Sequence, residues 1–281
     1  MRKKKILSML PVYLFLLVFF AVSFFPVFFT FMSSFKSNMD ILTTGDSLIP
    51  KKFVLENYQK AWELADFSTY TKNSIFLSSF CVIGAILSST VCGYVFARAK
   101  FRGKEAVFYY MISSMFVSLG TLTLYPLLMM MKLVNLNKTL WGVIIIRVFG
   151  MNVTNLFIAR GYISTISPEI DEAAKIDGCS FFRIYYNIIF PLCKPLVATV
   201  AILAFRSSWN DYMLPMVFTM TDKTRMPLVV GIMHLKSSGA AASSWNLMLA
   251  GTAISLIPMM IIYLIFNRYF VTGMTSGAVK G

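Results

Sequence analysis

The chain has 281 residues, of which 57% are hydrophobic and 14% are charged, and its mean hydropathy is +0.70. A soluble domain carries about 25% charged residues, so this composition excludes a soluble enzyme, a disordered chain and a disulfide scaffold. The formal net charge is +14. In so apolar a chain we interpret it as membrane topology rather than nucleic-acid binding, because Lys and Arg gather in the cytoplasmic loops of membrane helices.

The N-terminus has four basic residues among its first five and then no charge from Ile6 to Phe35. A secretory signal peptide has an apolar region of only about 7–15 residues. We therefore expect an uncleaved membrane helix at the start of the chain.

Five further segments with few charges follow, and each is long enough for the roughly 20 apolar residues that cross the hydrocarbon core. Together they predict an all-α membrane protein with six transmembrane helices, in the windows 6–35, 73–97, 106–131, 139–159, 195–220 and 237–267. The pattern of residues 55–64 also predicts a short helix in the long first loop.

The density of basic residues predicts the orientation of these helices. Four of the seven residues 98–104 are basic, as are four of the first five, whereas the first long loop balances its Lys residues with Asp and Glu. Lys and Arg are enriched on the cytoplasmic side, so we expect both termini in the cytosol.

Motifs for catalysis are absent from the sequence. Gly103-Lys104 is followed by Glu105 rather than Ser or Thr, so there is no P-loop to hold nucleotide phosphates. His234 is the single histidine and the four cysteines form no CxxC pair, which argues against a metal centre. We expect no catalytic residue, metal or cofactor in this chain.

The loop of residues 167–190 carries the strongest local signals. Ser167 and Pro168 are typical of a helix start, and Gly178 is typical of a left-handed stop. A second helix is expected over residues 181–190, ended by Pro191. These features fit a docking element whose small residues let a partner approach, and they fit a solvated connector equally well.

The same loop resembles the EAA motif of ABC-importer permeases. Glu172-Ala173-Ala174, then Gly178, then Ile188-Ile189-Phe190-Pro191 match it at fixed spacing, with Phe190 standing where the family usually has Leu. The resemblance implies that this loop is the coupling helix that docks into a separate ATPase. It assigns this docking to Glu172, Ala173, Ala174, Asp177, Gly178, Ile188 and Pro191.

Similarity to the carbohydrate-importer branch, with its maltose-transporter-type permeases, extends along most of the chain. It is carried by Ser34-Phe35-Lys36, Glu56-Asn57-Tyr58, Asn73-Ser74, the segments 93–98, 126–127 and 209–211, and the tail 273–281. The resemblance implies a type I ABC-importer permease fold in the bacterial cytoplasmic membrane. It also implies a second permease subunit, two ATP-binding subunits that hold ATP and Mg, and an extracytoplasmic solute-binding protein.

The domains expected on this basis are an N-terminal helix and outer loop (1–72), a permease core (73–270) with coupling helices near 167–190, and a cytosolic tail (271–281).

Two predicted spans contain polar groups. A charge within the membrane faces a partner or a wet cavity, so Arg147 either pairs with Asp211 to hold two helices together or lines the translocation path. Helical spacing places Arg206, Trp209, Asn210 and Met213 on one face. Amides, carboxylates and aromatic rings bind neutral sugars. If these spans line the translocation path, the residues expected to contact the substrate are Arg147, Trp209, Asn210, Asp211 and Tyr212.

The sequence therefore predicts one permease subunit of an ATP-driven sugar or oligosaccharide importer. The alternatives are an autonomous ion-coupled carrier or channel, and an ABC permease for another solute such as a sugar or glycerol phosphate. Which sugar is moved, and which of the two permeases contacts it, stay open at this point.

Overall fold

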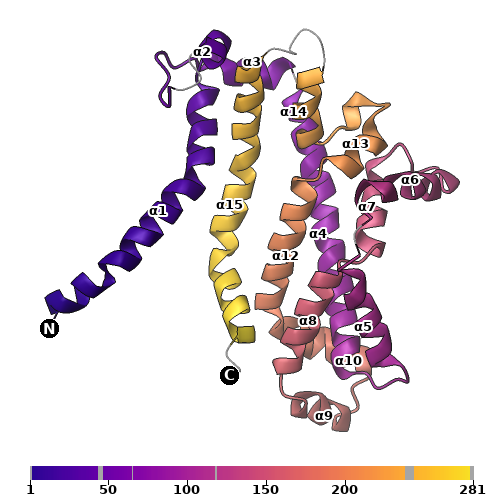
Figure 1. Cartoon of the computed structure of the whole chain (residues 1–281). Coiled ribbons are helices and arrows are strands. Elements are labelled where there is room, and N and C mark those ends of the chain that lie inside the picture. The colour runs from indigo at the N-terminus through magenta and orange to yellow at the C-terminus, as the bar shows by residue number, and fades with distance from the viewer. Residues whose placement is uncertain (1, 44–46, 65, 118, 238–243, 279–281) are drawn as a thin grey trace. The chain divides into compact units, whose positions relative to one another are not determined.

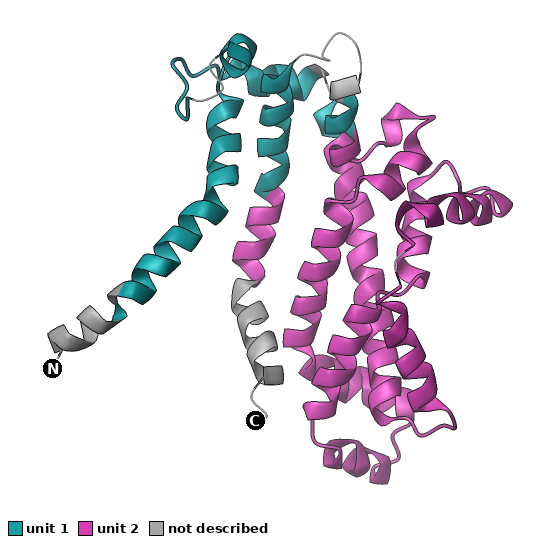
Figure 2. Ribbon diagram, in the orientation of Figure 1, with its two compact units in different colours: residues 1–68, 231–257 teal, residues 69–230, 258–281 magenta. Residues whose placement is uncertain are grey.

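The computed structural model describes residues 2–43, 47–64, 66–117, 119–237 and 244–278, and the regular secondary structure in these ranges is helical (Figure 1). The chain divides into two compact units, shown in Figure 2. Unit 1 comprises Met1–Ser68 and Gly231–Ile257, and unit 2 comprises Thr69–Val230 and Pro258–Gly281.

Unit 1 begins with the long helix predicted at the N-terminus. Its helices are α1 (Arg2–Ser34), α2 (Asn38–Thr43) and α3 (Glu56–Leu64), together with the parts of α14 (Leu228–Ser237) and α15 (Trp245–Ala278) that fall within its ranges. The short helix expected over residues 55–64 is present as α3.

Buried Asn57 organises the junction between α1 and α3. Its Nδ2 donates to the carbonyl oxygens of Ser34 and Lys36, both at 2.8 Å, and its Oδ1 accepts from Nδ2 of Asn246 at 2.8 Å. The ring of Tyr58 lies 5.2 Å from that of Phe35. Segments 34–36 and 56–58, two of those that carry the resemblance, are therefore in contact. The side chain of Asn57 in the second segment hydrogen-bonds to backbone carbonyls in the first.

Unit 2 is built around α4 (Phe67–Arg98), which belongs to it from Thr69 onward. The elements that follow are α5 (Lys104–Ser114), η1 (Gly120–Thr123), α6 (Leu124–Leu133), α7 (Leu140–Phe149), α8 (Val153–Thr165), α9 (Glu169–Ile176), α10 (Phe181–Ile184), the π-helical η2 (Tyr185–Ile189), α11 (Phe190–Leu192), α12 (Lys194–Trp209), α13 (Met213–Thr219) and η3 (Lys223–Arg225).

Within the described residues, three continuous helical stretches are long and apolar enough to cross a membrane: Pro11–Ser34, Phe67–Arg98 and Trp245–Phe266. Two further spans result if bent pairs are joined, α7 with α8 at 44° and Phe181–Leu192 with α12 at 80°. The first, second and sixth predicted helices are thus continuous, and the fourth is interrupted between α7 and α8. The fifth, predicted over residues 195–220, is interrupted between α12 and α13.

The third predicted span, over residues 106–131, is interrupted before Tyr125 and Pro126, the residues at which the sequence suggested a break or kink. Helix α5 ends at Ser114, and a short 3-10 turn, η1, precedes α6. Gly120 at the start of this turn has a φ of +54°, a left-handed conformation that cannot continue an α-helix. The apolar pattern continues across the interruption, so charge alone could not reveal it.

The second loop helix also differs from its prediction, because Pro191 does not end it. Helix α11 continues to Leu192, and the 80° bend with α12 follows. Pro191 is thus the next-to-last residue of a helical stretch that begins at Phe181. Helix α15 runs to Ala278, beyond residue 271 where the tail was expected to start.

Candidate functional site

The ends of α9 are formed by the residues that the sequence suggested. The amide of Glu169 donates to Oγ of Ser167 at 3.3 Å, and Pro168 stands at the N-cap. At the other end, Gly178 has a φ of +78°, its amide donates to the Lys175 carbonyl, and the amide of Cys179 donates to the Ala174 carbonyl. This pair of bonds is a Schellman motif, which satisfies the last carbonyls of the helix.

Helix α9 has one buried and one exposed face. Asp171 and Ala174 are buried, Ala174 to 5% of its accessible surface. Ile176 is 87% exposed, and Ala173 is exposed beside it. Ala173 and Ile176 therefore form a small exposed apolar surface on the face of α9 opposite to its buried residues.

The residues that the resemblance assigned to docking differ in their exposure to solvent. Those at the surface are Glu172, Ala173, Asp177, Gly178 and Pro191, whereas Ala174 packs inward and Ile188 is half-buried. Of the two adjacent alanines of the motif, one is therefore exposed and the other is buried.

A buried ion pair secures the inner face of α9 to α4. Nε of Arg98 lies 3.0 Å from Oδ2 of Asp171, and the hydroxyl of Tyr94 donates to Oδ1 at 3.0 Å. Nη2 of Arg98 also donates to the carbonyl of Ile166 at 2.6 Å. The spacing of Asp171 in the sequence suits the N-terminal turn of a helix, but it does not indicate a partner 73 residues earlier in the chain.

Aromatic packing attaches the second loop helix to the same stretch of α4. The ring of Tyr94 lies 4.6 Å from Phe181 and 5.4 Å from Tyr185, and the Tyr185 hydroxyl is 2.8 Å from Oγ1 of Thr90. Gly93 lets α4 approach α8 closely, since a Cβ there would lie 2.7 Å from Cβ of Ala159. α8, α9 and α10 thus share one buried cluster with α4.

The polar groups of the fourth and fifth predicted spans meet in unit 2. Arg147 on α7 forms an ion pair with Asp211, which follows α12, and its Nη1 donates to Oγ of Ser207 at 2.9 Å. Within the described part of the chain, the buried Nε of Arg147 has no hydrogen-bond partner. The structure contains the helix-linking pair that was one of the two interpretations, and it leaves one donor unsatisfied.

The prediction that Arg206, Trp209, Asn210 and Met213 share a helix face was wrong. Helix α12 ends at Trp209 and α13 begins at Met213. Trp209 is buried, with 2% of its surface exposed, whereas Arg206 and Asn210 are exposed. Asn210 ends the helix by donating from Nδ2 to the Arg206 carbonyl at 3.0 Å, and Tyr212 is half-buried beyond this break.

Trp209 borders an apolar groove of unit 2. It stacks on Phe205 at 5.2 Å, and both rings line a space of about 500 Å³. The remaining wall is formed by Ile75, Ser79, Val82, Ile83, Pro258, Ile261 and Ile262. The groove offers mainly hydrocarbon contact, with Ser79 as a polar group on its wall.

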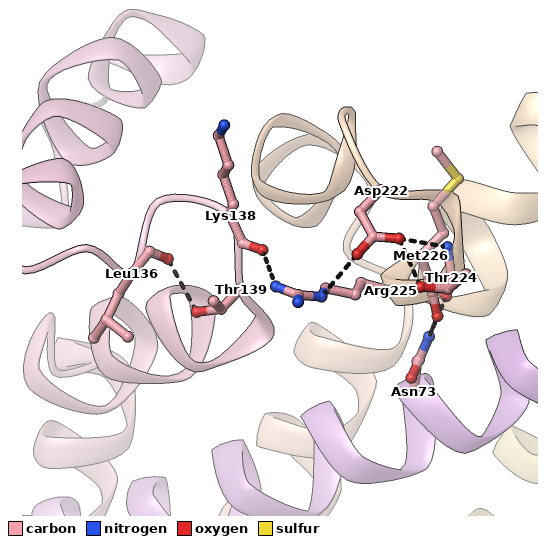
Figure 3. Close-up of polar contacts among 8 residues, drawn as sticks. All are labelled: Asn73, Leu136, Lys138, Thr139, Asp222, Thr224, Arg225 and Met226. Carbon is pink, nitrogen blue, oxygen red and sulfur yellow. Dashed lines mark hydrogen bonds and ion pairs between the residues drawn. The ribbon is translucent and has the colours of Figure 1, made fainter.

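Near the other end of α4, Asn73 binds the loop around η3 (Figure 3). Its Nδ2 donates to the carbonyls of Thr224 at 2.8 Å and Met226 at 3.0 Å. Arg225 lies 3.0 Å from Asp222, and its Nη1 donates to the carbonyl of Lys138 at 2.7 Å. The segment Asn73-Ser74 thus has a structural role, since Oγ of Ser74 also accepts from the amide of Leu228 at 2.7 Å.

The family model described as binding-protein-dependent transport system inner membrane component matches residues 89–276. The chain belongs to this family. The matched range contains Tyr94, Arg98, α9 and the Arg147–Asp211 pair. The protein is therefore a multi-pass membrane permease, and its family consists of transporter components rather than enzymes.

Curated relatives of this permease match it over nearly its whole length. The chain is 30% identical over 259 residues to the melibiose/raffinose/stachyose import permease protein MelC of Bacillus subtilis, covering 92% of both chains. It is 31% identical over 261 residues to the probable starch degradation products transport system permease protein AmyC of Thermoanaerobacterium thermosulfurigenes, covering 91% of both.

A solved structure matches the fold of this permease. The comparison with a chain of a bacterial ABC transporter involved in the import of the acidic polysaccharide alginate gives a TM-score of 0.78 at 23% identity. The match covers 96% of this chain and 98% of that chain. The permease accordingly has an ABC-importer permease fold.

Proposed function

We propose that this chain is a permease subunit of an ATP-driven importer that moves a sugar or oligosaccharide across the bacterial cytoplasmic membrane. Family membership and the sugar-importing relatives support this. An autonomous ion-coupled carrier has no support from these comparisons.

The proposed assembly contains a second permease subunit, two ATP-binding subunits and an extracytoplasmic solute-binding protein. ATP and Mg belong to the ATP-binding subunits. The single observation that carries this proposal is the two-faced construction of α9, whose inner face is bound to α4 while Ile176 and Ala173 stay exposed.

The proposed topology has six crossings with both termini in the cytosol. Helices α1, α4 and α15 cross as continuous helices, whereas α5–α6, α7–α8 and α12–α13 cross as interrupted ones. Broken helices occur in membranes where other protein or a wet cavity satisfies their free backbone groups. The domain assignment is an N-terminal segment 1–72, a permease core 73–270 and a tail 271–281.

The proposed substrate pathway passes the break between α12 and α13. Charges within the membrane normally face a partner or a wet cavity, and exposed Asn210 adjoins the Arg147–Asp211 pair. We assign sugar contact to Arg147, Asn210, Asp211 and Tyr212. Because Trp209 is buried, we assign it a structural role in the wall of the substrate pathway, without direct sugar contact.

The docking proposal is tested with two neighbouring cysteines. In a background with Cys179→Ala, Ala173→Cys and Ala174→Cys are expressed in intact cells and treated with a cysteine-to-lysine crosslinker. Exposed position 173 should capture a protein that contains a P-loop ATPase motif, and buried position 174 should not. Absence of such a protein at position 173 would contradict the proposed function.

A further inference from the structure

We propose that Tyr94, Arg98 and Asp171 form a clamp that makes α9 and α4 move as one body, so that they are positioning residues for transport. This inference rests on the proposed function, because it concerns how a displacement of α9 by the ATP-binding subunit reaches the membrane helices.

The three side chains satisfy one another closely. Both carboxylate oxygens of Asp171 are used, Oδ2 by Nε of Arg98 and Oδ1 by the hydroxyl of Tyr94, each at 3.0 Å. Nη2 of Arg98 holds the Ile166 carbonyl at 2.6 Å, two residues before Pro168. The clamp therefore fixes both α9 and the chain that leads into it.

Burial makes this geometry specific. The exposed fraction of the side chain is 11% for Arg98 and 4% for Asp171. Charges removed from water are tolerated only where their partners are well placed, so a displacement of α9 relative to α4 would leave a buried carboxylate without its cation. Exposed ion pairs impose no such penalty because water replaces the lost partner.

Helix α9 depends on this attachment for its direction. It has eight residues, and an isolated helix of that length is not stable in water. Its buried residues are Asp171 and Ala174. The ion pair of Asp171 therefore fixes the orientation of this short helix, so that a displacement of α9 can be transmitted to α4.

The attachment points follow one face of α4. Thr90, Tyr94 and Arg98 are spaced four residues apart, and residues with this spacing lie above one another on a helix. Thr90 contacts Tyr185 of η2, and Tyr94 and Arg98 contact Asp171 of α9. Both η2 and α9 are thus attached to the C-terminal part of α4.

A nearby ion pair provides a matched control. Nη2 of Arg160 lies 2.9 Å from Oε1 of Glu105, which links α8 to α5. The Glu105 side chain is about half exposed. Its removal should leave the link between α9 and α4 intact.

The test measures coupling in the reconstituted complete importer. Arg98→Gln and Tyr94→Phe are compared with Glu105→Gln for the amount of assembled complex, for ATPase activity and for solute imported per ATP hydrolysed. Because a buried charge loses its partner, Arg98→Gln should lower import per ATP about tenfold. Tyr94→Phe keeps the ion pair and should lower it about twofold to threefold, whereas Glu105→Gln should match the wild type.

Rescue separates positioning from folding. Arg98→Lys keeps the charge and should recover part of the import per ATP, even where the amount of complex is equal in both variants. If Arg98→Gln does not assemble, Tyr94→Phe carries the test by itself. Wild-type import per ATP in Tyr94→Phe, together with wild-type coupling in any assembled Arg98→Gln complex, would overturn the clamp. Failure of position 173 to capture an ATPase would instead overturn the proposed function.

Discussion

The two ends of α4 are held by contrasting chemistry. Near its C-terminal end, Arg98 forms a buried ion pair with Asp171 of α9. Near its N-terminal end, Asn73 binds backbone carbonyls of the η3 loop, and the adjacent Asp222–Arg225 pair is exposed (Figure 3). At 1.5 Å per residue, roughly 37 Å of helix separates Asn73 from Arg98.

This difference indicates that the C-terminal end of α4 is attached to α9 in one fixed geometry, whereas the N-terminal end is attached to a loop. A buried charge tolerates one arrangement of its partner, so the α9 end is suited to transmit a displacement. Hydrogen bonds to carbonyls beside an exposed pair can be exchanged for water. The exposed part of the η3 loop, around Asp222 and Thr224, is therefore expected to adapt when the helix moves, whereas the buried bond between Ser74 and Leu228 is expected to persist.

The largest expected effect compares one arginine at each end. Arg98→Ala leaves the buried Asp171 carboxylate unpaired and should destabilise the protein by about 3–5 kcal/mol. Arg225→Ala removes an exposed pair and one bond to a carbonyl, which should cost about 1 kcal/mol. Thermal denaturation of the solubilised protein, followed by size-exclusion chromatography, measures both. Equal losses of stability in Arg98→Ala and Arg225→Ala would contradict the proposed difference between the two ends of α4.

Two glycines test the close approach of α4 to α8. Gly93→Val would force a side chain against Ala159, whose carbonyl carbon would lie 3.0 Å from the new Cβ. Such overpacking should cost about 1–3 kcal/mol. A Cβ added at Gly161 on α8 would meet no described atom within 4 Å, so Gly161→Ala should stabilise the helix by about 0.5–1 kcal/mol. The same thermal assay compares them, and a tolerated Gly93→Val would contradict the packing.

Gly178→Ala should have a smaller effect, which sharpens the account of α9 itself. The φ of +78° disfavours a side chain, although the space around the position is open. The strain should cost about 1–2 kcal/mol. Hydrogen exchange at Gly178 and Cys179, whose amides close the helix end, should rise. Unchanged exchange would show that the Schellman motif does not depend on glycine.

The smallest effect is a pH dependence at the exposed end. The hydrogen bond from Thr224 lowers the pKa of Asp222 below its usual 3.8, and Arg225 adds to this. Since the folded pKa is the lower one, the stabilisation is complete above the unfolded pKa and is lost as the pH falls through the folded pKa. Hydrogen exchange in residues 222–226 should therefore increase only in strong acid, and Asp222→Asn should remove this dependence. An increase between pH 7 and pH 5 would contradict it.

Local sequence signals predicted the parts of the fold that depend on local structure. Pro168 and Gly178 indicated both ends of α9, because caps and left-handed stops are properties of a few adjacent residues. Uninterrupted apolar runs likewise indicated α1, α4 and α15. The position of the break, at Gly120, was missed because apolar residues continue across it.

Contacts between distant segments could not be predicted in the same way. The assumed helix face around Trp209 failed because α12 ends there, after which Asn210 caps it. The burial of Asp171 beside exposed Glu172 could not be predicted, since its partner Arg98 is 73 residues away. Only the packing of α9 on α4 shows which acidic residue is buried and which faces outward.

Rigid connection of α9 to α4 is the central claim, and a distance between the two helices tests it most directly. Spin labels at exposed positions Ile83 of α4 and Lys175 of α9, introduced as cysteines without the native thiols, report this distance by pulsed electron paramagnetic resonance. We expect one narrow distribution that is unchanged when ATP binds to the complete importer, and a broad one after Arg98→Ala. A wild-type distance that shifts with ATP would contradict the account.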